Sequence, residues 1–328
     1  MPEPQPLVTC GSWPTSSITF WYQVNPFMNN TFMLLVAAVL GSAMVSGCTL
    51  PAQRVELLDR IGRVETRDMG AATVHRYQGT DDAHVNSILI ETDNALVLID
   101  AQHFLSRSME LQRYIDSLDK PLDRIIITHS DPENYMGLPA LDADAPVHAA
   151  PETLENMQAN AESLLTRRKQ QGRPWSRQYP DEIRYPTETL EASFVVDGIE
   201  YRTENLADSE APDQIIIAMP ALQALHTADI LQLDTHIVIV DPDAYLAAID
   251  RIDALIDEGN YRYLLTGRDE ILDAAAIESV RVYVEEARDI LAEDPSPEKY
   301  RARIEAAFPS YGEMGEVLDA MILAGAFD

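Results

Sequence analysis

The interpretation of this sequence starts from Ile127-Thr128-His129-Ser130-Asp131-Pro132-Glu133-Asn134-Tyr135-Met136-Gly137. The stretch begins where a short apolar run, residues 124–128 (RIIIT), ends, and that run has the composition of a buried strand. Four side chains with metal-binding or hydrogen-bonding groups follow at once, namely His129, Asp131, Glu133 and Asn134. Because α/β sheets place their sites beyond the carboxyl ends of strands, the sequence predicts a functional site here.

The segments that precede this stretch show the two-residue period of β-strands. Residues 72–78 (ATVHRYQ) and 84–92 (HVNSILIET) alternate apolar and polar side chains, whereas residues 95–100 (ALVLID) form an unbroken apolar run. Turn-forming residues separate the last two runs. Residues 84–100 are therefore predicted to form a β-hairpin.

The rest of the chain alternates helical and strand patterns. Apolar residues recur at helical spacing in 106–118, residues 151–171 read as a charged helix, and the tail from Ala244 is mainly helical. Further strands are predicted at residues 194–201, 214–219, 222–226, 237–240 and 261–265. Apolar strands that alternate with amphipathic helices predict the α/β class.

The chain is strongly acidic. Its 328 residues include 54 Asp and Glu against 24 Lys and Arg, which gives a formal net charge of −30. Nucleic-acid affinity depends on clustered Lys and Arg, so this balance excludes nucleic acid as a main partner. The 46% of hydrophobic residues is enough for a packed globular domain.

The first 50 residues differ from the rest, since they contain no Lys or Arg and one acidic residue. Residues 32–45 (FMLLVAAVLGSAMV) have the length of a signal-peptide apolar region and are short for a membrane-spanning helix. Val45-Ser46-Gly47-Cys48 follows and resembles the bacterial lipobox, in which a peptidase cuts before a Cys that becomes lipid-modified. We therefore predict lipidation of Cys48 and a lipid anchor in the cell envelope, on the periplasmic side. Because Thr49 stands where an Asp would favour the inner membrane, the resemblance favours the outer membrane.

These features predict three segments. Residues 1–47 form a leader and a lipoprotein signal peptide, of which 1–27 are not translated if synthesis starts at Met28. Residues 48–71 form a tether, and residues 72–328 form the folded domain. If the leader is removed, no second Cys remains for a disulfide or a thiolate metal site.

Three segments, in order and spacing, resemble the metallo-β-lactamase superfamily. Asn86-Ser87 and the apolar run that ends at Asp100 resemble the opening hairpin of that family. Residues 128–137 resemble its signature TH-x-H-x-D-H-x-x-G, and residues 210–229 resemble its H-T-P-G strand and the next strand, which ends in a bridging Asp. The resemblance runs from about Ala72 to Gly267. It implies a four-layer αββα sandwich that carries a metal-dependent hydrolase site.

The resemblance maps the metal ligands of the family onto an unusual set of side chains. The first His is kept as His129 and the bridging Asp as Asp229. The other positions hold Asp131 and Asn134 in place of two His of the signature, Glu133 in place of its Asp, Glu210 in place of the downstream His, and Arg268 in place of the last His. A zinc pair needs several neutral imidazoles, and these positions supply one.

One of these replacements resembles a known variant of the family. The run Ser209-Glu210-Ala211-Pro212 is similar to the T-E-A-P run of the alkylsulfatase branch, in which the Glu is a metal ligand. The resemblance therefore implies that Glu210 can still bind a metal.

The mapped carboxylates need a positive charge among them. Two carboxylates 4 Å apart repel by about 4 kcal/mol at an effective dielectric constant near 20. A divalent ion can supply the charge, and oxygen ligands with one imidazole suit Mn²⁺, Mg²⁺, Ca²⁺ or Fe²⁺ better than Zn²⁺. The guanidinium of Arg268 can also supply it, by pairing with a carboxylate.

Two functions stay open on the sequence alone. The first is a hydrolase of ester-like or anionic small molecules with one divalent ion, in which Arg268 repels a second ion and orients an anionic group of the substrate. Its ion would be held by His129, Asp131, Glu210 and Asp229, and Glu133 or Asp229 would accept a proton from water. The second is a metal-free lipoprotein that keeps the fold to bind a ligand, with Arg268 paired to Asp131 or Glu133.

The remaining candidates are expected to have structural roles. His103 could approach the site from the loop after the hairpin, although a place on the surface of that loop is favoured, and His226 is expected in the core. Tyr179 lies in an irregular segment, residues 172–186, that is predicted either to wall the site or to pack as an ordinary loop.

Overall fold

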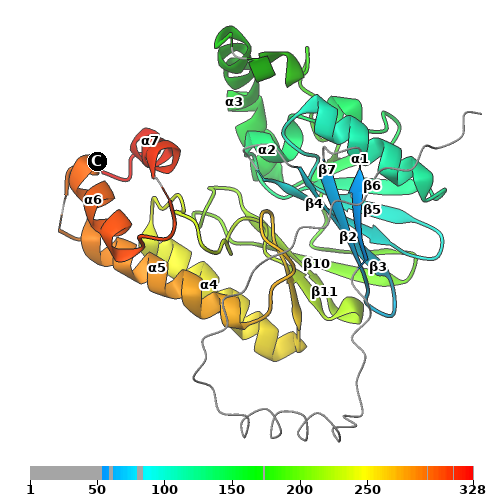
Figure 1. Cartoon of the computed structure of the whole chain (residues 1–328). Coiled ribbons are helices and arrows are strands. Elements are labelled where there is room, and N and C mark those ends of the chain that lie inside the picture. The colour runs from blue at the N-terminus through cyan, green and yellow to red at the C-terminus, as the bar shows by residue number, and fades with distance from the viewer. Residues whose placement is uncertain are drawn as a thin grey trace, which may run out of the picture. The chain divides into compact units, whose positions relative to one another are not determined.

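The computed structural model describes residues 54–58, 62–79, 84–172, 174–293, 295–312 and 314–327. The predicted signal peptide and Cys48 lie outside these residues. Two mixed sheets and several helices make up the described part of the chain (Figure 1).

Eight strands form the first sheet and follow one another in chain order. They are β1 (Arg54–Leu58), β2 (Gly62–Asp68), β3 (Thr73–Gly79), β4 (Asn86–Glu91), β5 (Leu96–Ile99), β6 (Leu122–Ile127), β7 (Val147–Ala149) and β8 (Glu188–Thr189). The strands from β1 to β5 pair antiparallel, and those from β5 to β8 pair parallel. The parallel part is the part that ends at the predicted site, as expected for strands joined by crossover helices.

Five strands form the second sheet. Their order across the sheet is β13 (Tyr263–Leu265), β12 (Ala224–His226), β11 (Ile215–Met219), β10 (Ile199–Asn205) and β9 (Ser193–Val196). β12 and β13 pair parallel and the other neighbours antiparallel.

Seven α-helices are assigned among the described residues. They are α1 (Leu105–Ser117), α2 (Pro132–Tyr135), α3 (Pro151–Gln170), α4 (Pro242–Gly259), α5 (Ala275–Leu291), α6 (Pro297–Ala307) and α7 (Gly315–Leu323). Short 3-10 helices span Leu138–Ala140, Pro174–Gln178 and Pro220–Leu222. Among the residues described, none of the helices combines the length and the apolar character needed to cross a membrane.

Three apolar cores show how these elements stack. The middle core joins the facing sides of the two sheets, through Ile88, Val97 and Ile126 on one side and Tyr201, Ile217 and Leu265 on the other. A second core packs α1 and α3 onto the outer side of the first sheet. A third packs α4 and α5 onto the outer side of the second sheet. The fold is therefore the predicted four-layer αββα sandwich.

The alternating pattern read from the sequence explains which sheet face each residue covers. In β4, Ile88 and Ile90 belong to the core between the sheets, whereas Leu89 belongs to the core under α1. In β5, which is apolar throughout, Val97 and Ile99 face the other sheet, and Leu96 and Leu98 face the helices. A strand with both faces covered has no polar position, which is why its sequence does not alternate.

Three predicted segments differ from the structure. The predicted strand 194–201 is a hairpin, since β9 and β10 pair antiparallel across a turn at residues 197 and 198. The predicted tether, residues 48–71, includes β1 and β2, so the sheet begins well before the predicted boundary at Ala72. Residues 237–240 form no strand, although Ile237 and Ile239 are buried in the core under α4 and α5. Apolar composition alone does not distinguish a buried loop from a buried strand.

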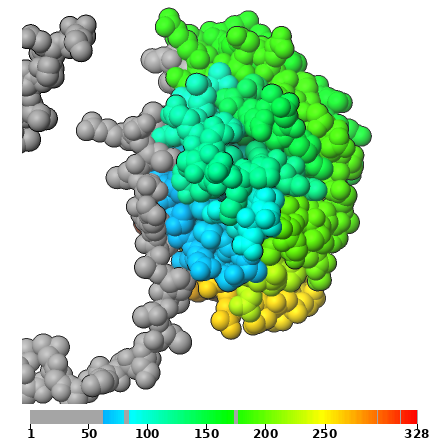
Figure 2. All heavy atoms as spheres, turned by 90° about the vertical axis from the view of Figure 1, so that its right-hand side faces the viewer, coloured from blue at the N-terminus to red at the C-terminus, as the bar shows by residue number. Residues whose placement is uncertain are grey.

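Most of one side of the molecule is built from the first half of the described chain. Figure 2 shows this side, on which blue, cyan and green atoms meet along a continuous surface, with yellow and orange atoms at its lower edge.

Candidate metal centre

The candidate site lies where strands of both sheets end. His129 and Asp131 follow β6, Glu210 follows β10, Asp229 follows β12, and Arg268 follows β13. Loops at the ends of strands can approach one another while the sheets stay fixed, so side chains far apart in sequence meet at one place.

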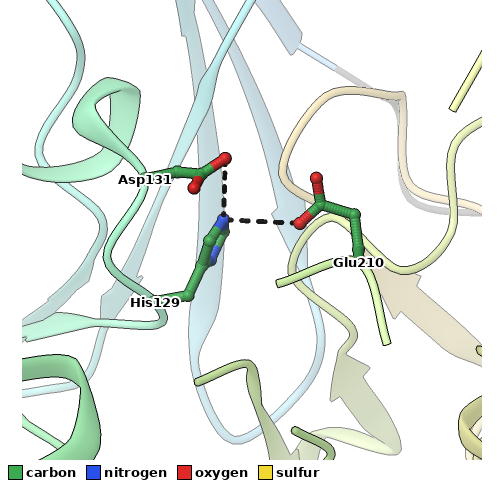
Figure 3. A group of neighbouring side chains, drawn as sticks. All are labelled: His129, Asp131 and Glu210. Atoms are coloured by element: carbon green, nitrogen blue, oxygen red, sulfur yellow. Dashed lines mark ion pairs between the residues drawn. The ribbon is translucent and has the colours of Figure 1, made fainter. Parts of the chain in front are cut away.

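His129, Asp131 and Glu210 form a compact group (Figure 3). Nε2 of His129 lies 3.9 Å from Oδ2 of Asp131 and 3.7 Å from Oε2 of Glu210, and one ligand atom from each residue lies within 4.8 Å of the other two. His129 is fully buried, and the Asp131 side chain is 38% exposed. The group thus has a buried imidazole and an accessible carboxylate.

The donor set of this group fits a divalent ion. Metal bonds to nitrogen and oxygen ligands measure about 2.0–2.6 Å, so the ligand atoms around one ion stand about 3–5 Å apart. The observed separations of 3.7 and 3.9 Å fall within that range. One imidazole and two carboxylates are a hard, oxygen-rich donor set, which agrees with the predicted preference for Mn²⁺, Fe²⁺, Mg²⁺ or Ca²⁺.

A chain of hydrogen bonds directs the His129 ring. The backbone N–H and the hydroxyl of Thr128 donate to the two carboxylate oxygens of Asp100, each at 2.9 Å. Thr128 Oγ1 also lies 2.9 Å from His129 Nδ1. Because the single hydroxyl hydrogen goes to Asp100, Nδ1–H donates to Thr128, and Nε2 is left facing Asp131 and Glu210.

The Asn134 amide lies beside the His129 ring and not in line with either of its nitrogens. Its Nδ2 lies 3.0 Å from Nε2 and 3.2 Å from Nδ1 of His129. Nearly equal distances to both nitrogens place the amide beside the ring. Asn134 is 1% exposed, so it packs against the imidazole and closes the site on that side.

Arg268 neutralises the other two carboxylates. Its Nε donates to Oδ2 of Asp229 at 3.0 Å, and its Nη2 donates to Oε1 of Glu133 at 2.6 Å. The exposed fractions of the side chains are 24% for Arg268, 18% for Glu133 and 2% for Asp229. The predicted pairing with Glu133 is therefore present, and the second partner is Asp229 rather than Asp131.

The pKa values of the carboxyl groups differ between Glu133, which Arg268 contacts, and the two acids beside His129. Burial opposes charge on Glu133, but Arg268 outweighs it and lowers the pKa of Glu133 to about 2. Burial and the neighbouring Glu133 raise the pKa of Asp131 to about 6. Burial and the neighbouring Asp131 raise the pKa of Glu210 well above its usual range. For Asp131 and Glu210 the facing cation is the His129 imidazole, and its effect does not outweigh burial and the neighbouring acids.

His129 itself responds to the same surplus of negative charge. Burial would lower the pKa of its imidazole, but Asp131, Asp229 and Glu210 outweigh burial and raise the pKa to about 9. Without another cation, the ring is therefore protonated at neutral pH. A divalent ion at the same place would compete with that proton.

Gln214 links the two halves of the site. The Gln214 side-chain amide is oriented so that both its nitrogen and its oxygen have a partner. Nε2 donates to Oε2 of Glu210 at 3.1 Å, and Oε1 accepts from the Asp229 backbone N–H at 3.0 Å. Gln214 is fully buried. It therefore holds Glu210 in place from behind.

The loop that carries Arg268 is held by the first sheet. Asn86 donates from its side chain to the backbone oxygens of Thr266 at 3.0 Å and Asp269 at 2.7 Å, and from its backbone to Gly267 at 2.6 Å. Gln78 donates to the backbone oxygen of Arg268 at 2.7 Å. β3 and β4 therefore position the guanidinium.

Behind Asn86 lies a buried ion pair. Arg76 donates to Oδ1 of Asn86 at 3.2 Å and to Oε2 of Glu65 at 2.6 Å. Arg76 and Glu65 are 1% and 2% exposed. Neither residue was predicted to support the site; Glu65 lies in the segment interpreted as a tether, and Arg76 in a predicted strand.

Two glycines allow close approaches around the site. A Cβ on Gly267 would overlap the Asp229 carboxylate, and a Cβ on Gly137 would overlap Ser108 and the backbone oxygens of residues 101 and 102. Glycine is therefore required at both places, one beside Arg268 and one at the end of the 128–137 stretch.

A cleft of about 520 Å³ opens onto the site. It is lined by Gln78, His84, Glu133, Glu210, Gln232, Leu233, Thr235, His236, Val238, Arg268, Asp269, Glu316, Val317 and Ala320. This volume is within the usual range for small-molecule sites. The site is therefore accessible to a small molecule from one side.

Three of the residues singled out in the sequence can now be placed. His103 is 8% exposed, not at the surface as expected; its Nε2 lies 2.8 Å from the Tyr179 hydroxyl, and it helps to lower the pKa of Glu133. Tyr179 is buried and packs against His103, so this part of the irregular segment lies beside the loop after the hairpin. His226 is buried as expected, and burial lowers the pKa of its imidazole to about 3.

The fold matches solved metallo-beta-lactamases. The enzyme from Pontibacter korlensis is 15% identical with a TM-score of 0.51, and the match covers 71% of this chain and 99% of that one. The mono-zinc form of FIM-1 from Pseudomonas aeruginosa is 13% identical with a TM-score of 0.53, covering 68% and 96%. The sec-alkyl sulfatase PisA1 is 19% identical with a TM-score of 0.52, covering 70% of this chain and 43% of that one.

Sequence comparison identifies the family. No curated protein matches the chain. The family profile described as "Metallo-beta-lactamase superfamily" matches residues 80–271, which is more than half of the chain and includes His129, Asp131, Glu133, Glu210, Asp229 and Arg268. The chain belongs to the metallo-beta-lactamase superfamily.

Proposed function

We propose that this protein is a hydrolase that uses one divalent metal ion, held by His129, Asp131 and Glu210, to cleave a small ester-like substrate. The observation that carries the proposal is the division of the site. Arg268 neutralises Glu133 and Asp229, whereas Asp131 and Glu210 face the imidazole of His129 at metal-ligand spacing, where a bound ion would replace the proton on that ring. Superfamily membership supports the reaction class.

The charges support one ion rather than two. A second ion beside Glu133 and Asp229 would have to displace a guanidinium that both carboxylates already contact. Like charges a few ångströms apart repel by several kcal/mol at the dielectric constant of a partly buried site. Arg268 thus takes the place of a second cation.

A bound divalent ion supplies Lewis acidity, which polarises water or the ester carbonyl. In the proposed reaction the water oxygen bonds to the carbonyl carbon, the bond from that carbon to the alcohol oxygen breaks, and the proton taken from water passes to the departing alkoxide. Glu133 is a weak base, because Arg268 holds its pKa near 2. We assign the proton acceptor to Asp229, whose charge acts on His129 and Asp131 and which the Nε hydrogen bond of Arg268 orients. Glu133 in turn holds the Arg268 guanidinium.

The test of the proposal is hydrolysis by the domain begun after Cys48, purified without chelator and loaded separately with Mn²⁺ or Zn²⁺. A series of carboxylic, phosphoric and sulfuric esters and lactones serves as substrates. We expect metal-dependent turnover that falls at least a hundredfold in Glu210→Gln. The matched control is Glu188→Gln, an exposed Glu of β8, which should keep full activity.

A second candidate is a metal-free binding protein that keeps the fold. The observation in its favour is the same Arg268 contact, since a cation that satisfies two carboxylates stabilises the site without a metal. The two candidates differ in metal content. A protein that binds no divalent ion and hydrolyses none of the esters supports this second candidate.

We also propose that the protein is a lipoprotein anchored in the cell envelope through Cys48. Support comes from the apolar run 32–45 and the small residues that lead to Cys48. Metabolic labelling with a fatty-acid analogue should label the wild-type chain and not Cys48→Ala. Equal labelling of both chains would contradict the anchor.

A further inference from the structure

The cleft beside the site is lined by residues of two kinds. Glu133, Glu210 and Arg268 are charged. Leu233, Val238, Val317 and Ala320 are apolar and half-buried, and we call these four residues the apolar wall. The apolar residues come from the loop after β12 and from α7, and Leu233, Val238 and Val317 also pack against the core under α4 and α5.

The α7 part of the apolar wall is an addition to the matched family region. The family profile ends at residue 271, whereas Val317 and Ala320 lie on α7 near the C-terminus. In an α-helix, residues three apart share a face, so these two side chains present one short apolar surface to the cleft. The rest of that surface comes from inside the family region.

The lining of the cleft, in which four acidic residues outnumber one Arg and two His, disfavours anionic ligands, a class that the sequence left open. Besides Glu133 and Glu210, the cleft is lined by Asp269 and by the exposed Glu316. Arg268, the Arg that lines it, already donates to two carboxylates. An anionic ligand would be repelled by these acids, whereas an uncharged ligand would not.

From these observations we infer that the substrate is an uncharged ester with an aliphatic chain, and that α7 and the loop after β12 bind this chain while the ester group lies at His129, Asp131 and Glu210. The inference rests on the proposed function for the identity of the reacting group. The apolar wall itself depends on no metal. Each methylene buried against such a wall contributes about a fourfold gain in affinity.

The experiment measures kcat/KM for p-nitrophenyl acetate, butyrate, hexanoate and octanoate with the Mn²⁺-loaded domain. We expect kcat/KM to rise with chain length, by about fourfold per methylene until the wall is covered. Val317→Asp should flatten this rise. Val317→Thr, which keeps the volume of the side chain, should weaken it in the same direction if the Asp variant does not fold.

The matched control is Leu323→Asp, because Leu323 lies on the same helix and is 86% exposed. It should keep the chain-length dependence of the wild type. An equal rise in the wild type and in both Val317 variants would overturn the inference.

A binding measurement separates this inference from the proposed function. The probes are three uncharged, non-hydrolysable ketones, 2-butanone, 2-hexanone and 2-octanone, and the free hexanoate anion. Each is titrated by NMR into the same variants, with and without Mn²⁺. We expect affinity to rise with ketone length, to fall in Val317→Asp, and to exceed that of hexanoate at least tenfold. If no ester is hydrolysed but ketone affinity follows this pattern, the proposed hydrolase function is wrong and the inferred binding of the aliphatic chain is supported. Length-independent ketone binding, or tighter binding of hexanoate, overturns the inference in either case.

Discussion

Arg268 donates a hydrogen bond from Nε to Oδ2 of Asp229 at 3.0 Å, across the ends of two parallel neighbouring strands, β12 and β13. The family resemblance gives Asp229 the role of a bridge between two metal ions, yet here an amino-acid side chain stands on one side of it. A guanidinium carries one positive charge and cannot accept a ligand's lone pair. The contact therefore supplies part of the positive charge that a second metal ion would bring to Asp229. It offers no position at which a ligand can coordinate.

Replacing Asp131, Asn134 and Arg268 by His should create a site for two zinc ions. The three changes supply neutral imidazoles and remove the cation that repels a second ion. Zinc content measured after dialysis should rise to two ions per chain. Arg303→His, an exposed Arg of α6 paired with Glu293, is the control and should leave the zinc content unchanged. A triple variant that binds no additional zinc would show that the mapping of ligand positions is wrong.

Glu133→Gln should make the stability of the metal-free protein less dependent on acid pH. The pKa of Glu133 is lowered from an ordinary 4.5 to about 2. Its stabilising contribution is therefore fully present above pH 4.5 and disappears as pH falls toward 2. The free energy of unfolding should differ between wild type and variant by about 2–3 kcal/mol at pH 7. Denaturant titrations at intervals from pH 7 to pH 3 measure this difference, and a difference that stays constant contradicts the ion pair.

Asn86→Ala should loosen the loop that carries Arg268 and leave the His129 group intact. The variant loses two side-chain hydrogen bonds to that loop and leaves Arg76 without one of its acceptors. We expect a loss of about 2–4 kcal/mol in the free energy of unfolding, with metal stoichiometry unchanged. Asn160→Ala, at an exposed position of α3, should change stability by less than about 0.5 kcal/mol. Equal stability of the two variants would refute the supporting role of Asn86.

Gly267→Ala should disturb the site because the added methyl group would overlap the Asp229 carboxylate. Forced overpacking of this kind costs about 1–3 kcal/mol. Gly315→Ala is the matched control, since a Cβ there meets no atom and alanine favours the first turn of α7. Thermal melts should therefore show a lower Tm for the first variant and an equal or higher Tm for the second. A neutral Gly267→Ala would mean that Asp229 does not lie where its contact with Arg268 requires.

Much of the fold could be predicted from the period of apolar residues. The alternation in 84–92 and the unbroken run in 95–100 correspond to β4 and β5, and the helical spacing in 106–118 corresponds to α1. β2 was missed because its buried Glu65 resembles a surface residue in the sequence. Its charge is compensated by Arg76 on the neighbouring strand, and that pairing is visible only after the strands are placed.

The sequence predicted which charged residues meet at the candidate site. It did not predict which of them contact Arg268 and which lie beside His129. His129, Asp131, Glu133, Glu210, Asp229 and Arg268 were identified from the family resemblance, whereas Gln214, which contacts Glu210 and Asp229, was not. That Arg268 would contact Asp229 and Glu133, leaving His129, Asp131 and Glu210 as a separate group, depends on the positions that Asn86 and Gln78 impose on its loop. The burial of His103 beside Tyr179 depends likewise on the packing of a distant segment.

The central claim is one divalent ion per chain at His129, Asp131 and Glu210. Elemental analysis of the domain begun after Cys48, purified without chelator and then dialysed against Mn²⁺ or Zn²⁺, tests it most directly. We predict one ion per chain in the wild-type protein and none in His129→Ala. Two ions per chain would contradict the role of Arg268 as a replacement for the second cation, and no bound ion would contradict the metal site itself.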